Sequence, residues 1–255
     1  AHIDHLGDGL GNGSLARNDE KGLVHFGADA NASGVAAVLA IARTLAGEQA
    51  LNKQQMRRSV TFALWSGEEM GLLGSSYYAK KLSDGDPRAQ SLSASVSAYL
   101  NMDMVGRLRS RLVLQGVGSS SWWKDAIERH NVPVGLPITL QDDSYLPTDA
   151  MTFYLRRVPI LNAFTGGHAD YHSPRDTADK INYGGLAQIG DLMAGLTREL
   201  MFASDLPDYI ELERPKLRAG AARMRVYLGT IPDYAGDSIN LSLIHISEPT
   251  RRYAI

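Results

Sequence analysis

Residues 64–75 read Leu64-Trp65-Ser66-Gly67-Glu68-Glu69-Met70-Gly71-Leu72-Leu73-Gly74-Ser75, and the interpretation of the whole chain starts from them. The apolar run before them, residues 60–65, predicts a buried strand. Neighbouring side chains on extended backbone point in opposite directions, so Glu68 and Glu69 cannot serve the same purpose. One of them can hold a metal ion while the other faces a substrate or a water. The structural alternative is a solvated acidic turn.

The composition of the chain excludes several classes of protein. Its 255 residues fit one large α/β domain, or one domain plus a fragment, and 44% hydrophobic residues are enough for a sizeable core. The formal net charge of −2 gives no indication of nucleic acid or of an anionic membrane as a partner. No cysteine is present, which excludes disulfides and thiolate ligands. No apolar run is long enough to predict a membrane span.

Strand-like and helix-like patterns alternate from residue 24 to about residue 203. Strands are predicted at 60–65, 96–104, 111–117 and 158–164, and helices at 33–45, 72–82, 122–130, 148–156 and 184–203. This alternation predicts an α/β fold with a mainly parallel central sheet and helices on both faces. In such open sheets the site lies at the carboxyl ends of the strands.

Five side chains of metal-ligand type stand where a strand is expected to give way to a loop. They are His2, Asp29, Glu69, Asp103 and His172. Two histidines and three carboxylates suit zinc. If Asp29 bridges, each of two zinc ions gains one histidine, one further carboxylate and the shared aspartate, and keeps an open position for water. The structural alternative for Asp29 is a helix-capping carboxylate.

Three further residues have a possible role beside these ligands. His2 and Asp4 lie two apart, which on extended backbone puts both side chains on one face, so that Asp4 can fix the imidazole tautomer. Asp149 is either a helix N-cap or a carboxylate facing the site, and the cap is preferred. His168 either lines the pocket or is structural or exposed, and the second interpretation is preferred.

The order of the motifs resembles that of metallopeptidase family twenty-eight, the di-zinc aminopeptidase family, over residues 2 to about 203. The matching segments are AHIDH at 1–5, GADANASG at 27–34, GEEMGLLGS at 67–75, NMDMVG at 101–106 and YHSPRDT at 171–177. The resemblance implies a three-layer zinc-exopeptidase fold, two Zn²⁺ per chain and peptide substrates with a free N-terminus. It also implies a secreted, periplasmic or cell-envelope protein.

The resemblance also assigns metal ligands. It implies that His2 and Asp103 bind one zinc, that Glu69 and His172 bind the other, and that Asp29 binds both.

Other residues receive roles in catalysis from the same resemblance. Glu68 would be the general base that takes a proton from a metal-activated water, and Asp4 would support His2. Tyr171 would donate to the oxyanion, with a core or rim tyrosine as an equal alternative. The family often has a second Asp after the bridging one, where this chain has Ala30. Since that position is not expected to be a ligand, the metal site is expected to survive.

The chain is expected to divide into four parts. Residues 1–206 would be the peptidase domain without its N-terminal strands, because a proposed ligand stands at position 2. Residues 207–223 would be a linker and 224–240 the start of a truncated PDZ-type domain. Residues 241–255 resemble a translated sequencing-library adapter, which would be an artefact.

Two other functions stay open at this point. A carboxypeptidase or a glutaminyl cyclase belongs to the same fold group, and the cyclase type binds a single zinc. A catalytically inactive, peptidase-like binding module would lack ligands, and the predicted set here is complete.

Overall fold

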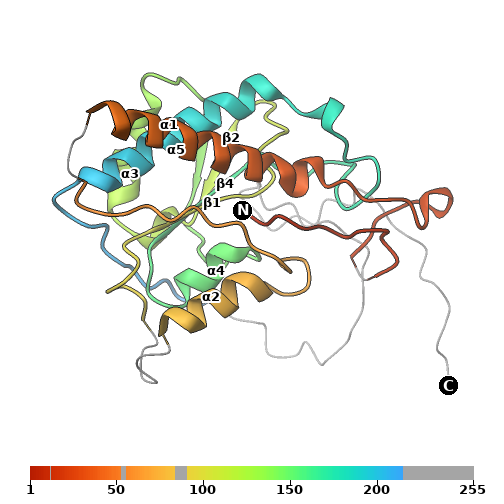
Figure 1. Ribbon diagram of the computed structural model, residues 1–255, viewed down its shortest axis with the longest axis horizontal. Coiled ribbons are helices and arrows are strands. Elements are labelled where there is room, and N and C mark those ends of the chain that lie inside the picture. The colour runs from red at the N-terminus through yellow and green to blue at the C-terminus, as the bar shows by residue number, and fades with distance from the viewer. Residues whose placement is uncertain (12, 53–55, 84–90, 215–255) are drawn as a thin grey trace.

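A four-stranded sheet in the order β1-β4-β2-β3 lies at the centre of the computed structural model, which describes residues 1–11, 13–52, 56–83 and 91–214 (Figure 1). The strands are β1 (Tyr99–Met102), β2 (Leu112–Gln115), β3 (Ile138–Gln141) and β4 (Ile160–Phe164). The pairs β1–β4 and β2–β3 are parallel, and β2–β4 is antiparallel. The predicted mainly parallel sheet is confirmed, with one antiparallel pairing in its middle.

Helices cover both faces of this sheet, as expected for a three-layer α/β fold (Figure 1). One layer consists of α1 (Gly34–Asn52), α3 (Trp122–Asn131) and α5 (Tyr183–Phe202), in which α5 contacts the other two. On the opposite face α2 (Leu73–Ser83) packs against α4 (Asp149–Tyr154), and α4 contacts β1 and β4. Short helical turns lie at Asn18–Glu20, Ala28–Ser33, Val117–Ser119 and Ala178–Lys180.

The core lies between the sheet and the layer of α1, α3 and α5. All residues of β2 and β4 are buried, which explains why these strands read as continuous apolar runs. Along α5 the buried apolar residues recur at helical spacing, at Leu186, Ile189, Leu192, Met193 and Leu196.

Residues Ala28–Leu51, which include α1, are long and apolar enough to cross a membrane by length and composition alone. This is weak evidence for a span, because the core helix of a globular domain meets the same criteria. In this structure α1 packs against α5 and buries Val38, Ile41 and Leu45.

The strand predicted at 60–65 is wrong. Within the described part of the chain, the pairing of this segment is a single parallel bridge between Trp65 and His2. A cavity of about 490 Å³ is lined both by residues 59–63 of this segment and by residues 95–100, which reach the start of β1. The segment forms no ladder with β1 among the described residues.

Residues 207–214 form the described part of the expected linker, and they lie against the domain. The backbone N–H of Ile210 donates to the carbonyl of Ser119 at 2.8 Å, and that of Leu212 donates to the hydroxyl of Tyr154 at 2.7 Å. The rest of the expected linker, the PDZ-type segment at 224–240 and the adapter-like segment at 241–255 lie outside the described residues.

Candidate functional site

A cavity of about 540 Å³ lies at the ends of β1 and β4, where most of the predicted site residues meet. These strands are parallel, so their carboxyl ends share one edge of the sheet. The chemically relevant residues that line the cavity are His2, Ala30, Glu68, Glu69, Asp103 and Tyr171.

One group of possible metal ligands, which we call the Glu69 cluster, consists of His5, Glu69 and His172. The Nδ1 of His5 and the Nε2 of His172 each lie 3.0 Å from Oε1 of Glu69. One ligand atom from each of the three residues lies within 4.8 Å of the other two. The sequence alone assigns no role to His5. Its contact partner Glu69 is 64 residues away in the sequence.

A second group, the His2 cluster, consists of His2, Glu68 and Asp103. The Nε2 of His2 lies 3.5 Å from Oδ1 of Asp103. His2 and Glu68 also offer ligand atoms within 4.8 Å of one another and of Glu69. Glu69 is therefore the residue that the two clusters share.

The two adjacent glutamates have opposite electrostatic environments. Burial, together with the charge of Asp103, raises the pKa of Glu68 to about 8. Burial also raises the pKa of Glu69, but its contacts with His172 and His5 outweigh this and hold the pKa well below the usual range. The two glutamates therefore differ: contacts with two histidines favour the ionised form of Glu69, whereas burial beside Asp103 disfavours that of Glu68.

Asp4 supports the site in a different way from the one expected. His2 Nδ1 donates to the backbone carbonyl of Asp4 at 2.9 Å, which leaves Nε2 free to bind a metal. The carboxylate of Asp4 instead accepts from the backbone N–H of Gly67, at 3.0 and 2.7 Å. Asp4 therefore holds the turn that carries the two glutamates, and its carbonyl fixes the tautomer of His2.

The backbone around the cavity is locally strained. Met104 and His172 have φ values of 54° and 51°, in the left-handed region that non-glycine residues rarely adopt. Met104 follows the predicted ligand Asp103, and His172 is itself a predicted ligand. Strain of this kind concentrates at functional sites, where the surrounding structure holds it in place.

The structure does not bring Asp29 to the cavity. Its carboxylate is fully buried and accepts hydrogen bonds from the backbone N–H of Gly106 at 2.6 Å and the hydroxyl of Ser33 at 3.0 Å. The Nε2 of His168 lies 3.1 Å from its other oxygen. The next residue, Ala30, lines the cavity in its place. The bridging position predicted for Asp29 is therefore not where its carboxylate lies.

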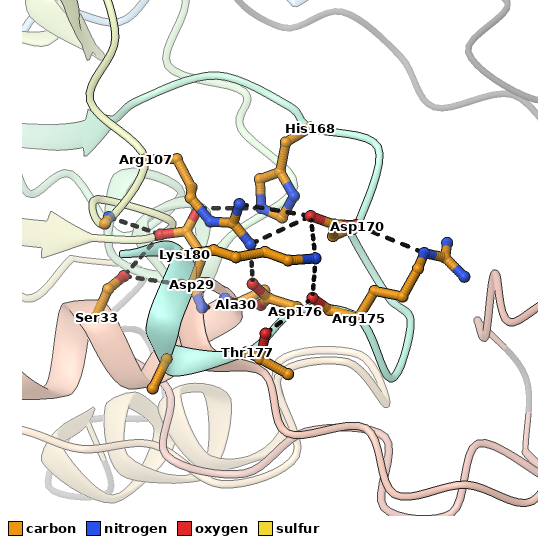
Figure 2. A network of polar contacts seen from close by, with 12 residues as sticks. Asp29, Ala30, Ser33, Arg107, His168, Asp170, Arg175, Asp176, Thr177 and Lys180 are labelled. Carbon is orange, nitrogen blue, oxygen red and sulfur yellow. Dashed lines mark hydrogen bonds and ion pairs between the residues drawn. The ribbon is translucent and has the colours of Figure 1, made fainter. Parts of the chain in front are cut away.

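Asp29 belongs to a polar cluster, which we call the Asp176 network (Figure 2). The Oδ2 of Asp176 accepts from the backbone N–H groups of Asp29 at 2.8 Å and Ala30 at 3.1 Å. Its Oδ1 accepts from Arg107 at 2.9 Å. Since His168 is buried in this network, it is structural, as preferred, and not exposed.

Two other candidates can now be placed. The N-cap of α4 is Thr148, whose side chain accepts from the N–H of Ala150, so the preference for Asp149 as the cap is wrong. Asp149 is instead buried, and burial raises its pKa. The ring of Tyr171 stacks on that of His172, with centroids 3.7 Å apart, and lines the cavity.

The Glu69 cluster fits a zinc ion. The Nε2 of His172 is buried and, among the described residues, makes no hydrogen bond, although it lies only 3.0 Å from a Glu69 oxygen. A nitrogen and an oxygen that are close but not aligned for hydrogen bonding are arranged as two ligands of one cation. The carbonyl of Gly13 accepts from Nδ1 of His172 at 2.9 Å, which orients the ring.

Comparison with known proteins agrees with this geometry. The sequence pattern of peptidase family M28 matches residues 1–197. Leupeptin-inactivating enzyme 1 from Streptomyces exfoliatus is 30% identical over 156 residues, which are 60% of this chain and 32% of that protein. Leucine aminopeptidase 2 from Arthroderma otae is 26% identical over 196 residues. This match covers 63% of the present chain and 36% of the length of that aminopeptidase. The chain thus spans about a third of the length of these curated relatives.

The fold also has solved counterparts. BSAP, a zinc aminopeptidase from Bacillus subtilis, superposes with a TM-score of 0.58 at 24% identity, over 73% of this chain and 46% of that one. At this identity the likeness is one of fold.

Proposed function

The chain belongs to peptidase family M28, and we propose that it is a zinc-dependent aminopeptidase that removes residues from the free N-terminus of peptides. The observation that carries the proposal is the environment of the two glutamates on one turn. Glu69 lies against two histidines, whereas Glu68 lies on the cavity wall near Asp103. This is the division of labour between ligand and base that metal-dependent hydrolysis requires.

The residues proposed to hold zinc form two pairs: Glu69 with His172, and His2 with Asp103. When bound there, zinc supplies a Lewis acid that polarises a carbonyl and lowers the pKa of water. The protein contributes ligands of fixed orientation, because carbonyl oxygens hold the Nδ1 atoms of His2 and His172.

Glu68 is proposed as the group that moves protons. Its carboxylate accepts a proton from the attacking water and returns it to the leaving amine nitrogen. Burial supports this role, because it places the pKa of Glu68 near neutrality, where a carboxyl group can both accept and donate. Tyr171 is proposed to donate its phenolic proton to the developing oxyanion, with its ring fixed by stacking on His172.

The charge of the cavity favours a substrate with a free amino group. Three carboxylate residues line it, Glu68, Glu69 and Asp103, and its described lining contains no lysine or arginine. An ammonium group is therefore better accommodated there than a carboxylate, which supports an aminopeptidase over a carboxypeptidase.

The experiment uses the whole chain with aminoacyl anilides and with the same substrates acetylated at the N-terminus. We expect hydrolysis of the free form, loss of activity after exhaustive chelation, and recovery with zinc. Undiminished turnover without metal, or a preference for the acetylated form, would contradict the proposal. Formation of pyroglutamate from an N-terminal glutamine would identify a cyclase, and a zinc-loaded chain without turnover would identify a binding module.

A further inference from the structure

We propose that this centre binds one zinc ion tightly, with His5 as the third protein ligand beside Glu69 and His172, and that Ala30 prevents tight binding of a second. The inference rests on the proposed function in taking zinc as the metal. It departs from the expectation of two bridged ions, because the residue expected to bridge them lies elsewhere.

The position of His5 supports its role as a ligand. Its Nδ1 and the Nε2 of His172 approach the same oxygen of Glu69, each at 3.0 Å, and the two rings are 5.4 Å apart between centroids. Two histidines and one glutamate form a ligand set that holds a single catalytic zinc and leaves a position open. The nearby His25 differs, because its ring nitrogens lie 2.8 Å from the Ser14 hydroxyl and 2.9 Å from the Leu23 carbonyl.

The position of Ala30 explains why a second ion lacks a bridge. Its side chain lies at the cavity in an apolar group with Met104, Val113 and Phe164. The carboxylate of Asp29 lies on the other side of the same loop, committed to Gly106, Ser33 and His168. The loop therefore presents a methyl group to the cavity at the place where a carboxylate would reach both clusters.

The His2 cluster alone is a poor site for a second ion. Without a bridge it offers His2 and Asp103, and a third ligand would have to be Glu68 or the shared Glu69. Using Glu68 as a ligand would remove the proposed base. A second zinc would thus be held by two protein ligands, fewer than the three that catalytic zinc sites use.

The test counts tightly bound zinc in the metal-free chain, titrated with Zn²⁺ against a chromophoric chelator. We expect one tight ion per chain. His5→Asn should weaken it by more than about 100-fold, beyond the 10–100-fold typical of a residue that only orients a ligand. The matched control, His25→Asn, should leave the affinity unchanged. Ala30→Asp should raise the number of tight ions to two, whereas Ala30→Asn, of nearly the same size, should leave it at one.

Each outcome is informative, provided that the melting of every metal-free variant shows that it is folded. Two tight ions in the unaltered chain, or tight binding that survives His5→Asn, would overturn the inference and leave the proposed function intact. An Ala30→Asp variant that still binds one ion would overturn the role of Ala30. Absence of zinc binding would overturn both proposals, whereas one tight ion without hydrolysis of aminoacyl anilides would contradict the proposed function alone.

Discussion

Two polar clusters of this molecule hold buried carboxylates in different ways. In the Asp176 network, both oxygens of Asp176 are occupied, by Arg107 on one side and by two backbone N–H groups on the other. In the Glu69 cluster, the Nε2 atoms of His5 and His172 are buried and have no hydrogen-bond partner among the residues that the structure describes. In the Asp176 network Arg107 Nε and His168 Nδ1 are also buried without a partner among the described residues, so the clusters differ at their carboxylates. Both oxygens of Asp176 have donors, whereas His172 Nε2 lies 3.0 Å from an oxygen of Glu69 without a hydrogen bond, as two ligands of one cation would.

This difference separates a structural use of buried charge from a functional one. A carboxylate with donors on both oxygens holds a segment in place, whereas two histidines that approach one carboxylate oxygen are arranged to share a cation with it. The Asp176 network fixes the loop whose other side forms the cavity wall at Ala30. The network therefore fixes the cavity wall at Ala30 and, within the described part of the chain, makes no hydrogen bond with the ligands of the Glu69 cluster.

The largest expected effect concerns the proposed catalytic base, Glu68, which adjoins the Glu69 cluster. Glu68→Gln should lower kcat on aminoacyl anilides by about 10²–10⁴-fold, because it removes a general base and leaves the shape of the cavity. Zinc content should stay at the value of the unaltered chain, since Glu68 is not proposed as a ligand. Loss of zinc in this variant would show that Glu68 and Glu69 have exchanged roles.

The next effect concerns the Asp176 network. Asp176→Asn should lower the free energy of unfolding by about 3–5 kcal/mol, because it removes the closer of the two carboxylates that pair with the nearly buried Arg107, at 2.9 Å, and leaves the 3.5 Å contact with Asp170. Denaturant unfolding measures this change, and the exposed Asp191→Asn serves as control, with an expected change within about 0.5 kcal/mol. At temperatures where the variant is folded, its zinc affinity should be unchanged. A variant of full stability would show that the network does not hold the loop.

The smallest expected effect is thermal stabilisation by zinc, compared between the unaltered chain and the Asp176→Asn variant. At a zinc concentration of about 100 times the dissociation constant, binding should stabilise the fold by about 2.7 kcal/mol. In a chain of this size that raises Tm by roughly 5–10 °C. Chelation should abolish the increase in the unaltered chain, and Asp176→Asn should show the same increase from a lower starting Tm. Equal melting with and without zinc would show that the Glu69 cluster needs no cation.

The sequence predicts most of the fold because its signals are local. Apolar runs predict β1, β2 and β4, and 3.6-residue periodicity predicts α1 to α5. The strand β3 has no such signal, because polar Thr139 and Gln141 interrupt it and none of its side chains is buried. The run at 60–65 has the signal, but among the described residues it pairs only through the Trp65–His2 bridge, because pairing is a tertiary property.

The site is predicted less completely, because the direction of a side chain on irregular backbone is not a local property. Ala30 has φ −105° and ψ 77° inside a kinked turn, so no periodicity shows which of Asp29 and Ala30 faces the cavity. His5 lacks a signal of its own, since its role depends on contact with Glu69, which is distant in sequence. The closeness of His2 and His5 in the sequence is the signal that could have pointed to a role for His5.

The cavity between residues 59–63 and β1 has a consequence for how the protein behaves in concentrated solution. β1 is an edge strand of the described sheet, and it faces an extended, largely unpaired segment across a mainly apolar gap. Free backbone edges beside apolar side chains, such as the exposed ring of Phe62, act as templates for another extended chain. Self-association should therefore begin at this gap and grow with protein concentration, and charged residues introduced along 59–63 should delay it.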